Sequence, residues 1–169
     1  MSGTSRDPMD PDDSVREVAF VVGVNDVALA PPSVVDIVRT GVIAGVFAGF
    51  LCEVMYGIGR IFGTNFEVKT GSSDQLAALP PFTPFVLPLV VAVLAALVVA
   101  LLFRRAGGAF WVLTLGFMLT ILSLGIPLFQ PSGVTWPTKI WLVLMHLVTG
   151  AIVVPALAFS LRPRRAGTY

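Results

Sequence analysis

Four long apolar stretches, separated by short polar segments, dominate the pattern of this chain. Each has close to the ~20 residues with which a helix crosses the ~30 Å hydrocarbon core of a bilayer. The apolar runs are continuous and do not alternate with polar positions, which favours membrane-spanning helices over the strands of a barrel. We therefore predict an all-α membrane protein, with four transmembrane helices in an antiparallel bundle within residues 33–161. The predicted spans are about 41–59, 84–103, 109–129 and 140–161.

The chain before the first span is polar and acidic, with one short apolar segment. Residues 1–17 hold five acidic residues and no apolar run. The apolar segment 18–24 is too short to cross a bilayer, so a short strand or an interfacial segment is expected there. Ser33 followed by Asp36 is the S-x-x-D pattern of a helix start. We expect residues 1–32 to form a cytoplasmic tail whose acidic part is disordered.

Basic residues next to the spans predict the orientation of the chain in the membrane. Short loops on the cytoplasmic side of a membrane protein carry the excess of Lys and Arg. On one side of the predicted bundle lie six arginines: Arg39, Arg104, Arg105, Arg162, Arg164 and Arg165. On the other side lie three basic residues: Arg60, Lys69 and Lys139. We therefore expect both termini in the cytoplasm, with residues 162–169 as a basic tail.

Two clusters of these arginines also suit the head groups of lipids. The first is Arg104 with Arg105, and the second is Arg162, Arg164 and Arg165. A basic side chain near an anionic leaflet contributes about 1 kcal/mol of attraction. Setting the topology is by itself a sufficient role for both clusters, so contact with lipid head groups is an additional expectation.

Composition agrees with a membrane protein and excludes several functions. Of the 169 residues, 56% are hydrophobic and 12% are charged, about half the charge of a soluble domain, and the mean hydropathy is +0.88. This is not the composition of a disordered chain, a nucleic-acid binder or an ordinary soluble enzyme. The single cysteine, Cys52, excludes an internal disulfide and a cysteine-rich metal site. No motif for hydrolysis, phosphate binding or redox chemistry is present, so we expect neither an enzyme nor a cofactor.

A ridge of small residues follows one face of the first span. Its members, spaced four apart in two parallel rows, are Gly41, Gly45, Gly49, Ala44 and Ala48. Small residues at this spacing let another helix backbone approach closely, where lipid offers no hydrophobic driving force. Two interpretations are open: the ridge packs against another helix of the same bundle, or it is a docking face for another subunit.

One acid and one histidine lie within the predicted spans at matching depth. Glu53 continues the glycine row about 9 Å below the outer end of its helix, and His146 lies about 10.5 Å below the same side. Ser123 and Thr120 of the third span fall near this level. A carboxylate within a span costs about 2.5–3.5 kcal/mol, so it is expected to face protein or water. Three interpretations are open: a buried hydrogen bond that fixes helix packing, a titrating or ligand-binding site, or an acid wetted by head-group water.

Three prolines within the spans indicate bends. Pro88 and Pro127 lie near the outer ends of their helices, and Pro155 lies in the inner part of the last one. Each proline removes a backbone donor and bends its helix. Two bends on one side would open a cavity at the depth of Glu53 and His146.

Three segments resemble a family of uncharacterised bacterial four-span membrane proteins, a family defined as a domain of unknown function. They are FGTNFEV (residues 62–68), ALPP (78–81) and LMHLVTGAIVVPAL (144–157), and the resemblance covers roughly residues 38–161. It implies four helices in a bacterial plasma membrane. It brings no activity, cofactor or catalytic residue with it.

Two functional hypotheses of different classes remain. The first is a non-enzymatic accessory subunit that packs against a larger membrane complex, such as a lipid or solute transporter. It rests on the small size, the glycine ridge and the absence of a reaction motif. The alternative is a small carrier or binding protein for a proton, an ion or an apolar molecule, working through Glu53 and His146. A cavity at the level of these two residues distinguishes the alternative, since a fully packed bundle around Glu53 would remove it.

Overall fold

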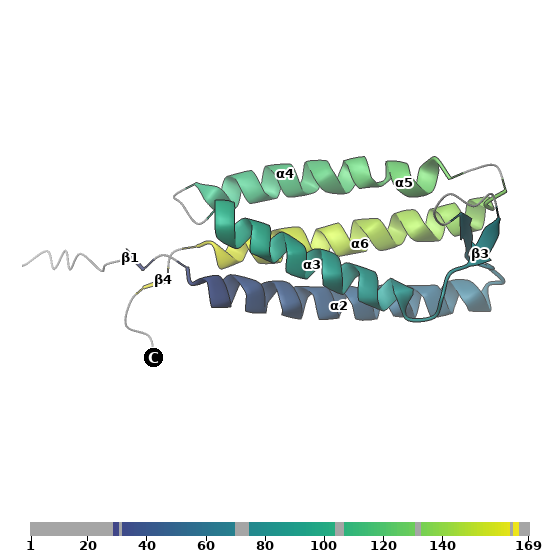
Figure 1. The fold of residues 1–169 in the computed structure, drawn as a ribbon, viewed down its shortest axis with the longest axis horizontal. Helices are drawn as coiled ribbons and strands as arrows, with labels where there is room; N and C mark the ends of the chain where they lie inside the picture. The colour runs from purple at the N-terminus through teal and green to yellow at the C-terminus, as the bar shows by residue number, and fades with distance from the viewer. Residues whose placement is uncertain are drawn as a thin grey trace, which may run out of the picture. The chain divides into compact units, whose positions relative to one another are not determined.

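The fold is a bundle of four apolar helices, as the sequence predicts (Figure 1). The computed structural model describes residues 29–30, 32–69, 75–103, 107–130, 133–162 and 164–165. The predicted acidic tail, the segment 18–24 and the loop with Arg104 and Arg105 lie outside these residues. The helices are α2 (Val34–Ile61), α3 (Thr83–Leu102), α4 (Gly108–Ser123), α5 (Gly125–Leu128) and α6 (Trp136–Ser160). Together α4 and α5 make one span, so four segments are long and apolar enough to cross a membrane.

The first helix begins where the S-x-x-D pattern predicts. The hydroxyl of Ser33 accepts a hydrogen bond from the backbone N–H of Asp36 at 3.0 Å. This bond satisfies one of the four N–H groups that have no partner within the helix. Asp36 also places a negative charge in the first turn, where the helix dipole favours it. The helix therefore starts at Val34, two turns before the apolar run that predicted the span.

The third span is broken between α4 and α5, and Pro127 explains the break. A proline has no N–H to donate to the carbonyl four residues earlier, and its ring clashes with that carbonyl. Four residues before Pro127 is Ser123, the last residue of α4. The Ser123 hydroxyl turns back and donates to the carbonyl of Thr120 at 2.7 Å. The bend predicted for this proline is therefore a break in the helix.

A small antiparallel hairpin closes one end of the bundle, in a segment from which only a polar turn was expected. Strand β2 (Glu67–Lys69) pairs with β3 (Leu76–Ala78), and Phe66 before β2 is completely buried. The Phe66 carbonyl accepts from the N–H of Leu79 at 2.9 Å, and its ring lies 4.6 Å from the ring of Tyr56 on α2. The buried phenylalanine thus attaches the hairpin to the helices. We call this the hairpin end of the bundle.

The helices pack unequally. Helix α2 packs against α3 and α6, whereas α4 packs mainly on α6. In Figure 1, α4 and α5 run along the upper side and α2 along the lower side, with α3 crossing obliquely between them in front of α6. Helix α3 begins near α2 and rises toward α4 along its length. The two helices α3 and α4 therefore diverge toward the hairpin end.

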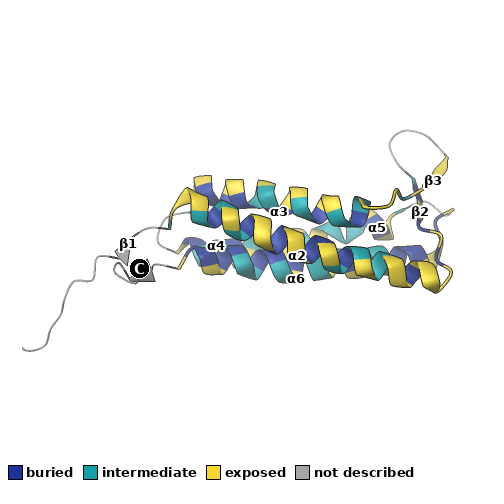
Figure 2. Cartoon of the chain, turned by 90° about the horizontal axis from the view of Figure 1, so that it is seen from below, coloured by how far each residue is buried: buried dark blue, intermediate teal, exposed yellow. Residues whose placement is uncertain are grey.

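Burial follows the packing. In the most apolar window of each span, 33% of residues are buried in α2 and in α6, but only 6% in α4–α5. Figure 2 shows exposed residues repeated along the outward faces of the helices. These exposed residues are mostly large apolar side chains, which suits a surface covered by lipid.

A second, separate pair of strands joins the two ends of the described chain. Strand β1 (Leu29–Ala30) pairs antiparallel with β4 (Arg164–Arg165). The register places Leu29 opposite Arg165 and Ala30 opposite Arg164. The sequence showed no strand pattern at either site.

Candidate functional site: a lateral cavity between α3 and α4

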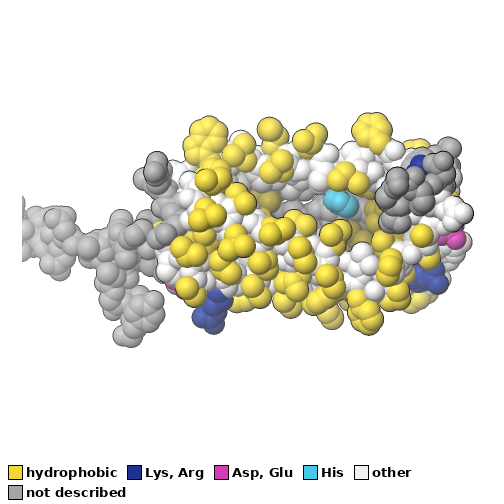
Figure 3. Space-filling view, in the orientation of Figure 1, with side chains coloured by type: hydrophobic (Ala, Val, Ile, Leu, Met, Phe, Trp, Pro, Cys, Tyr) yellow, Lys and Arg dark blue, Asp and Glu magenta, His cyan; other side chains and the backbone are white. Residues whose placement is uncertain are grey.

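A cavity of about 600 Å³ lies between α3, α4–α5 and α6. Its lining includes strongly exposed side chains on both flanking helices: Leu87 of α3 is 55% exposed and Leu119 of α4 is 60% exposed. Figure 3 shows the hollow on one face of the bundle, with the histidine coloured cyan inside it. Because its rim belongs to two membrane-spanning helices, the cavity opens sideways, toward lipid.

The cavity has a polar part and an apolar part along its length. The polar side chains lie at the start of α3, near the middle of α6 and late in α4: Thr83, Thr120, Ser123, His146 and Thr149. Farther from the hairpin the same helices contribute only apolar lining: Leu87, Pro88, Val91, Ala95, Gly116, Val153 and Val154. Among the described lining residues none is acidic and none is Lys or Arg. The described lining therefore offers no carboxylate, ammonium or guanidinium group to a molecule in the cavity.

The histidine ring is oriented by its own helix. His146 Nδ1 lies 2.8 Å from the carbonyl oxygen of Leu142. A carbonyl only accepts, so Nδ1 carries the proton of this hydrogen bond. In the neutral ring, Nε2 is then an acceptor with its lone pair uncommitted. His146 therefore brings an acceptor to the cavity.

Three hydroxyl groups of the lining are oriented in the same way. Each donates to a carbonyl of its own helix: Thr120 to Gly116 at 2.8 Å, Ser123 to Thr120 at 2.7 Å and Thr149 to Met145 at 2.8 Å. A hydroxyl has one proton and two lone pairs. Because that proton is already used, each hydroxyl has only acceptor capacity left for a molecule in the cavity.

The α2 helix meets this site through Cys52. The Cys52 Sγ atom lies 3.5 Å from Thr149 Oγ1 and 3.6 Å from the carbonyl oxygen of Met145. The thiol and the Thr149 hydroxyl both donate to the carbonyl of Met145, and in the contact between them either atom could be the donor. Cys52 is 1% exposed, so it is a small buried residue that joins α2 to α6.

Glu53 lies outside the cavity. It is partly buried, it is not a lining residue, and its Oε2 atom is buried without a hydrogen-bond partner among the described residues. Within the same part of the chain, the only hydrogen bond of the His146 side chain goes to Leu142. The structure therefore brings His146, Thr120 and Ser123 to one cavity but does not join Glu53 to His146 by a hydrogen bond.

The glycine ridge packs inside the bundle. A Cβ added to Gly45 would come within 2.9 Å of Ala92 Cβ, and one added to Gly49 within 2.5 Å of the Phe85 carbonyl oxygen, both on α3. Gly41 faces Ala96 and Ala92 in the same way. The neighbouring Ala44 and Ala48 are buried at 6% and 0% exposure. Of the two interpretations of the ridge, contact with another helix of the same chain is the one observed.

Metal binding has no support among the described residues, where no group of three His, Cys, Asp or Glu side chains comes together. Of the arginines expected at lipid head groups, Arg162 is exposed, with its guanidinium 4.3 Å from the centre of the Phe159 ring. Arg164 and Arg165 form β4, while Arg104 and Arg105 lie in the loop that is not described.

Sequence reasoning missed one polar residue of the cavity, Thr83, whereas the position of Thr149 beside His146 indicated an inward face for both. Thr149 lies one turn after His146 on the same helix face. Thr83 had no such signal, since its position depends on where α3 begins relative to α6.

Comparison with known proteins supports the resemblance found in the sequence. No curated protein and no solved structure matches the chain. One family model matches residues 32–163, which contain all four spans, the hairpin and the residues that line the cavity. This chain therefore belongs to the family described as a family of unknown function, DUF6069.

Proposed function

We propose that this protein is a non-enzymatic, membrane-embedded binding protein for an apolar or amphipathic small molecule, which enters from the bilayer between α3 and α4. The observation that carries the proposal is the lateral cavity. Its volume of about 600 Å³ falls within the ~300–1,000 Å³ of small-molecule sites. Such sites are lined mainly by apolar side chains with a few polar groups, and this cavity has that character. The proposal keeps His146 of the predicted pair and does not use Glu53.

Photolabelling tests the proposal. The purified protein in mild detergent is irradiated with an apolar aryl diazirine, and the labelled positions are mapped by peptide mass spectrometry. We expect saturable labelling of cavity residues on α3, α4 and α6, reduced by an excess of unlabelled dodecanol. Labelling spread evenly over the lipid-facing residues, without saturation, would contradict a binding cavity.

A matched pair of variants makes this test specific. Ala95 lines the apolar part of the cavity, so Ala95→Phe fills it. Ala151 is exposed on α6 and does not line the cavity, so Ala151→Phe adds the same volume elsewhere. We expect the first variant to remove the saturable labelling and the second to retain it. Equal labelling in both variants would place the binding outside the cavity.

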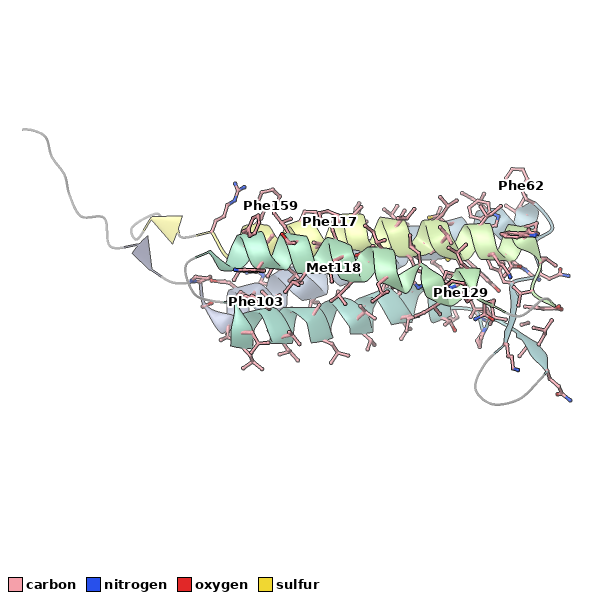
Figure 4. All side chains as sticks on the ribbon, turned by 90° about the horizontal axis from the view of Figure 1, so that it is seen from above. Phe62, Phe103, Phe117, Met118, Phe129 and Phe159 are labelled. Carbon is pink, nitrogen blue, oxygen red and sulfur yellow. The ribbon has the colours of Figure 1, made fainter. Side chains whose placement is uncertain are left out.

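A second candidate function is that of an accessory subunit in a larger membrane complex, such as a lipid or solute transporter. The specific observation in its favour is the exposure of the third span, of which only 6% is buried by the rest of the chain. Figure 4 shows Phe117 and Met118 on α4, and they are 43% and 59% exposed. Either lipid or a helix of a partner suits this surface.

Site-specific crosslinking distinguishes the two candidates. A photoreactive amino acid placed at Met118 should yield one crosslinked protein in native membranes if α4 is a subunit interface. The control position is Leu94, 57% exposed on α3. Crosslinks to lipid alone from both positions would remove the accessory-subunit function and leave the binding function in place.

We further propose that the protein resides in a bacterial plasma membrane with both termini in the cytoplasm, and that the arginine clusters contact lipid head groups there. In the sequence, six arginines flank the spans on one side and three basic residues flank them on the other, which supports this orientation. In a background with Cys52→Ser, Gln75→Cys probes the hairpin end and Ser33→Cys probes the opposite end; both positions are exposed. An impermeant maleimide should label only the first in intact cells. The reverse pattern would invert the topology.

A further inference from the structure

The hydrogen-bonding groups of the cavity point to one class of ligand. We infer that the occupant is an uncharged amphiphile with a hydroxyl head group, an aliphatic alcohol or a phenol, whose apolar body lies between α3 and α4. This inference rests on the proposed binding function and adds the chemistry of the ligand. It follows from which lining groups still have a proton to donate.

Almost every polar group in the cavity is left as an acceptor. The protons of Thr120, Ser123 and Thr149 are used on backbone carbonyls of their own helices. The Nδ1 proton of His146 is used on Leu142, so neutral His146 offers a lone pair at Nε2. Each of these groups already makes one hydrogen bond, and Thr149 also contacts the Cys52 thiol. What Thr120, Ser123 and the Nε2 atom of His146 still offer to a molecule in the cavity is acceptor capacity, which a ligand that donates can use.

Thr83 explains why a hydroxyl suits the cavity better than a head group that only donates. It lines the same cavity at the start of α3, and its side chain makes no hydrogen bond within the described part of the chain. Thr83 is partly buried, and its hydroxyl proton is available to an acceptor in the cavity. An alcohol or a phenol both donates and accepts, so one head group can satisfy the acceptors of α4 or α6 and the donor of α3.

The absence of charge among the described lining residues excludes ionic head groups. A carboxylate needs several donors or a cation, and an ammonium needs an anionic partner. The described lining provides neither a basic side chain other than the histidine nor any acid. Moving an unpaired ion from water into an apolar site is strongly unfavourable, so fatty acids and alkylammonium ions are expected to bind weakly.

The length of the apolar part suits an extended chain or a planar ring system. The lining of α3 runs from Thr83 to Ala95, about 18 Å of helix rise. The polar residues occupy the hairpin end of this length, and Ala95 lies at the other end together with Val154 of α6. A ligand with its hydroxyl near His146 would therefore direct its apolar body away from the hairpin, along the space between α3 and α4.

A series of ligands with one alkyl chain and different heads tests the inference on the unmodified protein. The probes are dodecanol, dodecyl methyl ether, dodecane and dodecanoate, each titrated into protein in nanodiscs. The readout is the rise in Tm and the Kd derived from it. We expect dodecanol to bind about tenfold more tightly than the ether, which has no proton to donate, and dodecanoate to bind most weakly.

The outcomes separate this inference from the proposed function. If dodecanol, the ether and dodecane bind equally, the cavity binds apolar molecules but does not select a donor, and the inference is overturned while the proposed function stands. If dodecanoate binds most tightly, the site prefers an anionic ligand, and the inference is overturned in this case too. If none of the probes raises Tm, both the inference and the proposed function fail.

Variants locate the selectivity in the acceptors. Thr120→Val and Ser123→Ala each remove one hydroxyl acceptor, and Thr114→Val is the control, because Thr114 is exposed on α4 and does not line the cavity. We expect the first two to weaken dodecanol severalfold and to leave the ether unchanged. The control should bind both ligands as the parent does. Loss of binding to both ligands in Thr120→Val would show a change of shape, not of hydrogen bonding, and would contradict the assignment of that acceptor.

Discussion

The side chain of Thr120 on α4 lies directly over Gly150 on α6, so closely that a Cβ at position 150 would collide with its methyl and hydroxyl groups. Gly150 is buried, and α4 has its main contact with α6. The absence of a side chain at Gly150 therefore allows α4 to approach the bundle at the level of the cavity. The same relation recurs at Gly116 of α4, where a Cβ would come within 2.7 Å of Val154 Cγ1.

This contact predicts that substitutions at positions 150 and 120 have non-additive effects on the free energy of unfolding. Gly150→Ala should lower the free energy of unfolding by about 1–3 kcal/mol, because overpacking displaces a neighbour. Thr120→Ala removes the groups that would collide, so the double variant should be more stable than the sum of the two single effects predicts. Thermal unfolding in detergent of the two single variants and the double variant measures this coupling. Additive effects would mean that the two positions do not share one space.

The glycine ridge gives a second prediction with a control on the same helix. Gly49→Ala should destabilise the protein by about 1–3 kcal/mol, because the new Cβ would lie 2.5 Å from the backbone oxygen of Phe85, which cannot rotate away. A Cβ added to Gly57 of α2 would meet no atom within 4 Å among the described residues. Gly57→Ala should therefore stabilise the helix by about 0.5–1 kcal/mol. Equal effects of both changes in thermal unfolding would contradict close packing of the ridge.

How much of this structure the sequence predicts depends on whether a feature is local. The four spans follow from the length and continuity of apolar runs, and the start of α2 follows from Ser33 and Asp36, because hydrophobicity and capping act within a few residues. The packing partner of the glycine ridge does not follow in this way. Gly45 requires a close neighbour, but only the tertiary fold decides that the neighbour is Ala92.

The sequence also did not predict how each helix is rotated about its own axis. Glu53 and His146 were predicted at equal depth, yet Cys52, about 100° away on the same helix, is the residue that faces α6. Thr120 and Ser123, predicted only as supporting residues, line the cavity with His146. Depth is a count of residues along one helix, whereas facing depends on the packing of several helices, so depth alone did not identify the right contact.

The hairpin was not predicted from the sequence for a similar reason. Its two strands have three residues each, which is too short for an alternating pattern to stand out. What holds it is the burial of Phe66 against Tyr56 and the close fit to Gly59. These contacts join residues of the loop to the helix before it and are invisible in the local composition, which shows only a polar, Gly- and Pro-rich segment.

That close fit makes a third prediction. A Cβ at Gly59 would lie 2.5 Å from Cζ of the Phe66 ring, and Phe66 has a positive φ of 51°, a conformation that costs a non-glycine residue energy and is kept by its surroundings. Gly59→Ala should expel the ring and loosen the hairpin, while the helices stay folded. Faster proteolysis between residues 69 and 75, with unchanged helical circular dichroism, is the expected result. Unchanged proteolysis would show that the ring adapts without losing its site.

The unpartnered oxygen of Glu53 gives the last prediction, which concerns the acid and the histidine together. A buried polar atom without a hydrogen bond lowers stability, and replacing it by an apolar group of similar length is neutral or stabilising. Glu53→Met should therefore leave the free energy of unfolding unchanged or raise it by about 1–3 kcal/mol.

Because no hydrogen bond joins Glu53 to His146, the effects of Glu53→Gln and His146→Gln should add within about 0.5 kcal/mol in the double variant. A larger coupling energy in thermal unfolding would support the predicted interaction between Glu53 and His146. If instead the effects add and Glu53→Met is the more stable protein, the acid is held in the span at a cost to the fold, and helix packing does not account for its presence.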